Sequence, residues 1–119
     1  MKSLAVGYQA LADVKSIYDG WYNNFEAKRQ LIPLYAIRAL FVCAQVYVAM
    51  CLMDQALIAA KKVAPLKAGD ADFTYYKGKI AAARYYLNNI LPGVSTTAAL
   101  IKSEEDSVLT CPEEALVVS

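Results

Sequence analysis

Residues 40–53 read Leu40-Phe41-Val42-Cys43-Ala44-Gln45-Val46-Tyr47-Val48-Ala49-Met50-Cys51-Leu52-Met53, and they are apolar at nearly every position. Their β-branched side chains would also suit a strand. However, the run is longer than most strands, contains no turn signal, and passes directly into the amphipathic segment Ala56–Val63. We therefore predict one long helix from near Leu31 to about Ala64, with Pro33 in its first turn, where the missing N–H is not needed.

This helix has to be covered on nearly every side, either by its own bundle or by another chain. Its uncharged part, Ala39–Met53, has fifteen residues and includes Gln45, whereas a membrane span needs about twenty residues. We therefore expect a buried core helix and no membrane span. We also expect the three cysteines to be small, buried, unpaired residues: Cys43, Cys51 and Cys111.

Three further segments have helical spacing. The first runs from Ser3, as N-cap, to Asn23, and a polar connector, Glu26–Gln30, follows it. The third helix is expected from Phe73 to Ile90, and the short fourth from Val94 to Lys102.

Capping and turn signals mark the boundaries of these helices. Asp70 or Asp72 would cap the third helix, and Pro92-Gly93 would end it. After the fourth helix, Ser103–Ser107 reads as an acidic exposed loop. Thr110-x-x-Glu113 resembles a capping box that starts a last helical turn, Pro112–Leu116.

These segments predict an all-α fold. Three long helices and a short fourth, joined by brief connections, form an up-down helical bundle with the second helix as its axis. Residues 1–119 are long enough for a single domain. Besides the middle of the second helix, we expect four residues of the third helix to hold the bundle together: Phe73, Tyr76, Ile80 and Leu87.

The composition points to a partner rather than to chemistry. Hydrophobic residues make up 58% of the chain and charged residues 19%, so disorder is excluded and some apolar surface is expected to be covered by a partner. The nine tyrosines recur at helical spacing and suit the edge of an interface. The net charge of +1 is scattered, which argues against nucleic-acid binding.

The sequence predicts no catalytic, cofactor-binding or metal-ligating residue. It contains no histidine, which excludes His-dependent nucleophilic sites and His-ligated metals. Its glycines are isolated, so no phosphate loop is present. Two groups of carboxylates, Glu104-Glu105-Asp106 and Glu113-Glu114, are expected to be solvated. Asp54 is expected to pair with Arg84 or Arg38, or to be exposed.

A family resemblance appears in Asp70-Ala71-Asp72-Phe73-Thr74-Tyr75-Tyr76-Lys77-Gly78-Lys79-Ile80-Ala81-Ala82-Ala83-Arg84-Tyr85-Tyr86-Leu87-Asn88-Asn89-Ile90-Leu91-Pro92. It resembles a segment near the C-terminus of the longer acyl-CoA dehydrogenases, through Lys79, Ala81, Ala83, Arg84, Leu91 and Pro92. Pro33-Leu34-Tyr35, the helix to Ala60 and the segment Leu109–Leu116 resemble neighbouring parts of the same domain.

The resemblance implies a non-catalytic accessory domain. Members of the family are flavoproteins of fatty acid metabolism that oxidise acyl-CoA thioesters with FAD. Their catalytic glutamate and their acyl-CoA and flavin sites lie in preceding domains, and no residue here matches them. We therefore expect this chain to bind no cofactor and to be inactive alone. Its expected partner is the rest of the enzyme body or a homo-oligomer, such as a dimer.

Two alternatives remain open from the sequence. The chain could be a stand-alone helical module that homodimerises through its apolar helix, or a peripheral membrane protein. The N-terminal residues lack the features of a secretory signal, and the cysteine usage suits a reducing compartment, so a cytoplasmic location is expected. The chain is expected to be an excised domain, a truncated reading frame or a stand-alone descendant of the enzyme.

Overall fold

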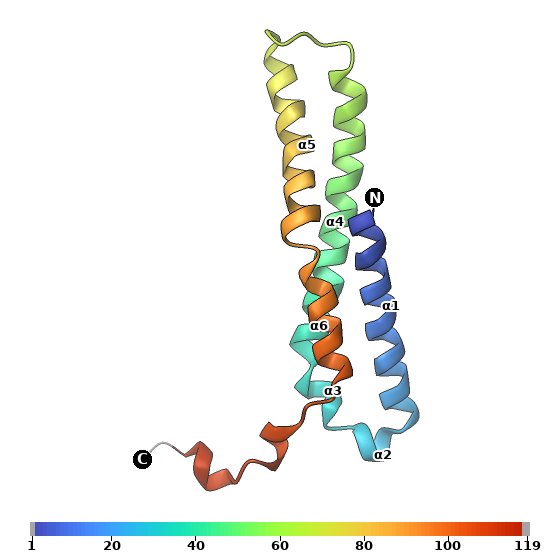
Figure 1. The fold of residues 1–119 in the computed structure, drawn as a ribbon, viewed down its shortest axis with the longest axis vertical. Coiled ribbons are helices and arrows are strands. Elements are labelled where there is room, and N and C mark those ends of the chain that lie inside the picture. Colours follow the sequence, from blue (N-terminus) through green and yellow to red (C-terminus); the bar gives the residue numbers. More distant parts are fainter. Residues whose placement is uncertain (1, 118–119) are drawn as a thin grey trace.

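A computed structural model describes residues 2–117 (Figure 1). In chain order, the helices are α1 (Lys2–Asn23), α2 (Phe25–Lys28), α3 (Leu31–Leu34), α4 (Ala36–Val63), α5 (Ala71–Asn89) and α6 (Gly93–Lys102), followed by the 3₁₀ turns η1 (Ser107–Thr110) and η2 (Glu113–Leu116). Residues 2–117 contain no strand. The predicted all-α bundle is therefore confirmed, with α1, α4 and α5 as its long helices.

Helix α4 is the axis of the bundle, as predicted. It packs along α5 in its upper half, and against both α1 and α6 in its lower half (Figure 1). Helices α5 and α6 follow one another along α4 and are separated by a break at Ile90–Pro92. The molecule is consequently a thin layer that measures 66 × 39 × 15 Å, with a two-helix hairpin at one end and three packed helices at the other.

The predicted second helix is divided at Tyr35. The backbone there leaves the helical region, with φ −103° and ψ 8°, and it separates α3 from α4. The side chains of Leu31 and Tyr35 are both buried. The Tyr35 hydroxyl donates a 2.7 Å hydrogen bond to the backbone oxygen of Glu105. The break thus lets α3 close the lower end of the bundle, which a continuous helix would not do.

Several predicted local features are wrong. Ser3 lies inside α1 rather than capping it, and the connector Glu26–Gln30 contains part of α2. Asp70 is the N-cap residue of α5, as one of the two sequence-based alternatives predicted, but its side chain accepts a hydrogen bond from the Lys67 N–H outside the helix and makes no capping bond. Thr110 belongs to η1 and bonds back to Ser107, so it forms no capping box with Glu113.

The core lies mainly in the lower half of the molecule. Helix α1 contributes Leu4, Ala10, Val14 and Trp21; α4 contributes Val42, Val46 and Ala49; the α5–α6 region contributes Leu87, Leu91, Val94, Ala98 and Ile101. Leu87 packs the bundle as predicted. Phe73, Tyr76 and Ile80 are only half-buried, because α1 and α6 do not extend along the upper half of α4 and α5.

Gly7 marks the closest approach between α1 and the α5–α6 break. A Cβ atom at this position would lie 3.1 Å from Leu91 Cδ1, and Leu91 is fully buried. A side chain at Gly20, by contrast, would meet nothing within 4 Å.

We predict that Gly7→Ala lowers the free energy of unfolding by about 1 kcal/mol, because the clash with an immobile Leu91 outweighs the gain in helix propensity. The matched variant Gly20→Ala should instead raise it by about 0.5–1 kcal/mol. Urea unfolding followed by circular dichroism measures both changes, and a stabilising Gly7→Ala would show that α1 does not pack this closely on Leu91.

Candidate functional site

Helix α4 has one buried side and one exposed apolar side. Val42, Val46 and Ala49 are fully buried against the bundle. The opposite side is free of charge and exposes a set of apolar residues at helical spacing, which we name the α4 face: Ile37, Leu40, Phe41, Ala44, Tyr47, Val48 and Ile58. Phe41 is 57% exposed and Tyr47 is 66% exposed, as much as polar surface residues commonly are.

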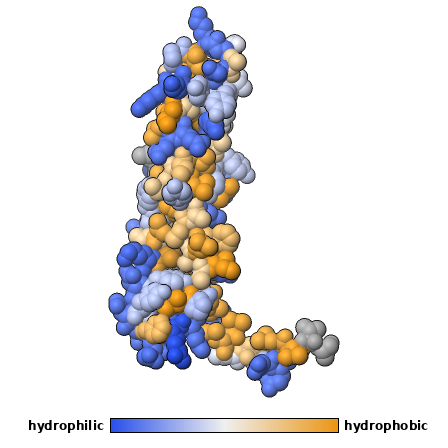
Figure 2. Space-filling model, turned by 180° about the vertical axis from the view of Figure 1, so that it is seen from behind, coloured by the Kyte–Doolittle hydropathy of each residue, from blue (hydrophilic) through white to orange (hydrophobic). Residues whose placement is uncertain are grey.

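The α4 face is part of a continuous apolar region. Figure 2, which views the molecule from behind, shows hydrophobic residues gathered along the middle of this side, where α4 lies behind α6 in Figure 1. The expectation of a core helix is therefore wrong for the outward half of α4. It is wrong for the cysteines too, since Cys43 is exposed and both Cys51 and Cys111 are half-exposed; all three are free thiols.

The chain exposes more surface than a compact protein of its mass. Its accessible surface is 8348 Å², whereas a compact 13.0 kDa monomer exposes about 6,300 Å². Its radius of gyration is 20.2 Å, against about 13.5 Å for a compact chain of this length. The excess of about 2,000 Å² exceeds the roughly 800 Å² that one partner buries in a standard interface. The excess exposed surface of the chain is therefore large enough to contain an interface of standard size.

Asp54 lies on the edge of the α4 face and is exposed, which was one of the two sequence-based alternatives. Among residues 2–117 it forms no ion pair with Arg38, Arg84 or any other cation. It ends the uncharged part of the helix, and Ile58 continues the α4 face one turn beyond it.

The tyrosines fall into two groups. Tyr18, Tyr35 and Tyr86 bury much of their rings and donate their hydroxyl protons to the backbone oxygens of Ile32, Glu105 and Gln45. Burial raises the pKa of Tyr18, with a smaller contribution from the neighbouring Tyr22, and burial alone raises the pKa of Tyr86. The remaining tyrosines are exposed, Tyr47 on the α4 face among them, except for Tyr76, which is half-buried.

Helix α4 also has the length and apolar composition of a membrane-crossing helix. The core helix of a soluble protein can have the same length and composition, so these two properties do not decide between a membrane-spanning helix and a core helix. The side of α4 that carries Val42 and Val46 is packed against α1 and α6.

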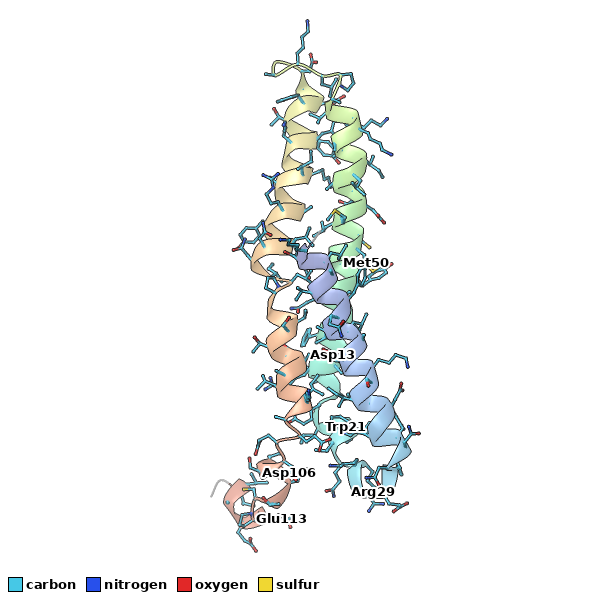
Figure 3. All side chains as sticks on the ribbon, turned by 45° about the vertical axis from the view of Figure 1, so that its right-hand side comes forward. Asp13, Trp21, Arg29, Met50, Asp106 and Glu113 are labelled. Carbon is cyan, nitrogen blue, oxygen red and sulfur yellow. The ribbon has the colours of Figure 1, made fainter. Side chains whose placement is uncertain are left out.

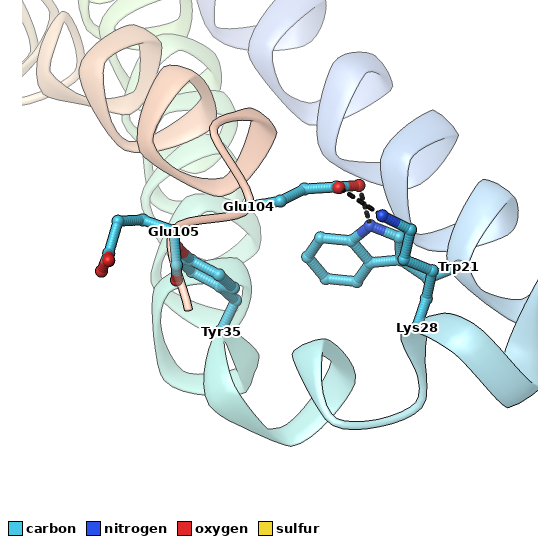
Figure 4. Close-up of polar contacts among 5 residues, drawn as sticks. All are labelled: Trp21, Lys28, Tyr35, Glu104 and Glu105. Carbon is cyan, nitrogen blue, oxygen red and sulfur yellow. Dashed lines mark hydrogen bonds and ion pairs between the residues drawn. The ribbon is translucent and has the colours of Figure 1, made fainter. Parts of the chain in front are cut away.

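A polar cluster ties the lower end of the bundle together (Figure 4). Glu104 accepts two hydrogen bonds of 2.7 Å, one from Trp21 Nε1 and one from Lys28 Nζ. Its backbone has a φ of +53°, a conformation that non-glycine residues rarely adopt. The prediction of a fully solvated acidic loop is therefore wrong at Glu104. Neither Trp21 nor Lys28 is near it in sequence, so no local pattern indicated the contact.

The ion pair with Lys28, together with the Trp21 hydrogen bond, lowers the pKa of Glu104 below its ordinary value of 4.5. A carboxylate whose pKa is lower in the folded state stabilises the fold above the unfolded-state pKa, and this stabilisation is lost as the pH falls through the folded-state pKa.

We predict that Glu104→Gln lowers the free energy of unfolding at pH 7 by about 1 kcal/mol, since the pair is only partly buried. The difference between the variant and the unmodified chain should shrink when the pH is lowered from 7 to about 3, because Glu104 takes up a proton as the pH falls through its lowered folded-state pKa. Urea titrations at the two pH values test this, with Glu113→Gln as the control that should change neither. An equal loss at both pH values would contradict the ion-pair account.

The groove between α1 and α6 does not have the lining that FAD needs. Its volume is about 420 Å³, and it is lined mostly by small or polar side chains, with Asp13 among them (Figure 3). A dinucleotide pyrophosphate needs a glycine-rich turn or a concentration of positive charge, and Lys102 is the one cation that lines this groove. No set of three or more Cys, Asp or Glu side chains within residues 2–117 is arranged to hold a metal ion.

The described residues therefore form a thin helical layer with a broad apolar face and with polar groups that tie its helices together. Comparison with known proteins assigns the family. The profile of the family described as "Acetyl-CoA dehydrogenase C-terminal like" matches residues 5–112, and the chain belongs to this family. The predicted resemblance to the C-terminal helical domain of acyl-CoA dehydrogenases is confirmed.

Two relatives from Syntrophomonas wolfei subsp. wolfei (strain DSM 2245B / Goettingen) are both named "Butyryl-CoA dehydrogenase". One is 38% identical over 114 residues and the other 34% identical over 109 residues, and each alignment covers 92% of this chain. The aligned region is 19% of the first relative and 18% of the second. The chain thus spans about a fifth of the length of these relatives and corresponds to an accessory domain of a larger enzyme.

Proposed function

We propose that this chain is an accessory domain that packs on the catalytic body of an acyl-CoA dehydrogenase through its α4 face. The observation that carries the proposal is the exposure of seven apolar residues on one side of α4, in a family whose relatives are about five times longer than this chain. An apolar area of this kind is costly to leave in water, at about 25 cal/mol for each Å². A second protein surface is the direct way to remove that cost.

In this proposal the catalytic body carries out the oxidation, and this chain contributes a packing surface. In such an enzyme, FAD oxidises an acyl-CoA thioester in fatty acid metabolism, at a site built by other domains. The residues described here supply a rigid surface that covers part of the body, and the expected location of the assembly is the cytoplasm.

A protein body suits the α4 face better than a lipid bilayer. Arg38 and Asp54 lie on α4 within the length of the apolar surface, and the buried side of α4 is already occupied by α1, α5 and α6. To cross a membrane, α4 would have to leave these helices and expose Val42, Val46 and Ala49. The loss of that packing opposes insertion.

The proposal is tested with a chimera in which this chain replaces the matched segment of one Syntrophomonas wolfei relative. We expect the purified chimera to retain flavin absorbance near 450 nm and to resist proteolysis at the junction, because the domain is docked. The chain alone should show no flavin absorbance. Rapid cleavage at the junction of a flavin-loaded chimera, or binding of the chain alone to liposomes, would argue against docking on the body.

A further inference from the structure

The C-terminal residues 103–117, which we name the arm, leave the lower end of the bundle sideways (Figure 1). The arm carries five acidic residues and no Lys or Arg: Glu104, Glu105, Asp106, Glu113 and Glu114. It also exposes apolar side chains that have no cover: Val108, Leu109, Leu116 and Val117. Figure 3 shows Asp106 and Glu113 beyond the three packed helices. The arm therefore has the composition of a segment that docks in a groove, but its apolar side chains are not covered within its own chain.

The opposite end of the molecule, the α4–α5 hairpin, has the complementary charge. Six of the twelve Lys and Arg residues of the chain lie between positions 61 and 84, against two acidic residues, Asp70 and Asp72. None of these six cations forms an ion pair with another residue in 2–117. Lys77 and Lys79 lie over the rings of Phe73 and Tyr75, each 5.5 Å from the ring centroid, so the hairpin presents a basic surface that has aromatic contacts but no acidic partner among the described residues.

The hairpin also carries a groove of about 210 Å³ between α4 and α5. It is lined by apolar, aromatic and cationic side chains: Gln55, Ile58, Ala59, Tyr75, Tyr76 and Lys79. The arm has apolar residues flanked by carboxylates, and such a segment fits a groove with this lining. Its apolar side chains would fill the groove, and a neighbouring carboxylate would pair with Lys79.

The arm cannot fill this groove in its own chain. Glu105 is held against Tyr35 by a 2.7 Å hydrogen bond. Ile58 lies 23 residues further along the chain from Tyr35, which is about 35 Å of helix. Val108 follows Glu105 by only three residues, a reach of about 10 Å. The groove that the arm can occupy therefore belongs to another molecule.

We propose that the occupant of the groove is the arm of a second copy of this chain. In two copies placed antiparallel, the lower end of each lies beside the hairpin of the other. Val108 and Leu109 of each arm then enter the partner groove, and the arm carboxylates approach the hairpin lysines. A two-fold arrangement forms each contact twice, which doubles a contact that is small on its own. This inference goes beyond the proposed function: of the α4 face it uses only Ile58, at the edge of the groove, and it leaves the part from Ile37 to Val48 free for the enzyme body.

Charge-reversal variants of the full chain test the proposal. Sedimentation at low salt should show a dimer whose association weakens at least tenfold when the salt is raised from about 50 to 300 mM, as exposed charge pairs require. The arm variant Glu113→Lys/Glu114→Lys and the hairpin variant Lys77→Glu/Lys79→Glu should each self-associate at least tenfold more weakly. An equimolar mixture of the two variants should regain the dimer through the reversed pairs.

A disulfide test identifies the contact itself. With Cys43→Ser and Cys51→Ser, the arm keeps Cys111, and Tyr75→Cys supplies a thiol beside the groove. Oxidation should link residues 111 and 75 between chains, whereas Tyr8→Cys on α1 should give no link to residue 111.

Four results would overturn the proposal. In sedimentation, the chain could remain a monomer at all concentrations, both charge-reversal variants could still self-associate, or their mixture could stay monomeric. In the oxidation test, the link between residues 111 and 75 could be absent. Phe41→Glu/Val48→Glu should still dimerise, which separates this inference from docking on the body.

Discussion

Replacement of Phe41 and Val48 by glutamate is expected to detach the chain from an acyl-CoA dehydrogenase body without unfolding it. Both side chains are exposed on the α4 face, so the isolated variant should keep its helical content and its free energy of unfolding to within about 0.5 kcal/mol. In the docked state, however, each glutamate would be buried without a partner, at a cost of several kcal/mol. We therefore expect the docked fraction to fall at least 100-fold.

The measurement is proteolysis of the junction in the chimera described above, in parallel for the variant and the unmodified chain. Tyr85→Glu is the matched control, since Tyr85 is as exposed as Phe41 but lies on α5, away from the α4 face. The control should be cleaved no faster than the unmodified chimera. Equal protection of the Phe41/Val48 variant would mean that a different surface contacts the body.

Leu91→Ala is expected to lower the free energy of unfolding by about 3 kcal/mol, because it truncates a fully buried core side chain. Leu91 is fully buried at the break between α5 and α6, where it also contacts the backbone of α1 at Gly7. The truncation leaves a cavity at the point where three helices meet, and the tight packing there gives the neighbours little room to collapse into it.

Leu57→Ala is the matched control for this substitution. It deletes the same atoms from a residue on α4 that is 55% exposed and outside the α4 face. Urea unfolding should show a change below about 0.5 kcal/mol for the control. Similar losses for the two variants would contradict the placement of the core in the lower half of the molecule.

The sequence predicted the helices well because their signals are local. Apolar spacing, Pro92-Gly93 and the uncharged run from Ala39 to Met53 placed the long helices to within a few residues. The break at Tyr35 was missed because the contacts of this residue are not local. Its ring is buried, and its hydroxyl donates a hydrogen bond to the backbone oxygen of Glu105, seventy residues later in the chain.

Burial was harder to predict than helicity. The apolar run on α4 predicted a covered helix, but a run that is apolar on every side does not show which side its own chain covers. One side of α4 lies against α1, α5 and α6, and the opposite side carries the α4 face. The Trp21–Lys28–Glu104 cluster was likewise invisible in the sequence, since its members join segments that are 76 and 83 residues apart.

The most direct test of the central claim compares side-chain protection in the free chain and in the chimera. Hydroxyl-radical footprinting should label Phe41 and Tyr47 in the free chain and leave both protected in the chimera, while Tyr85 is labelled equally in both. This outcome is predicted if the α4 face contacts the catalytic body. Unchanged labelling of Phe41 and Tyr47 in a flavin-loaded chimera, with new protection on α5, would contradict it.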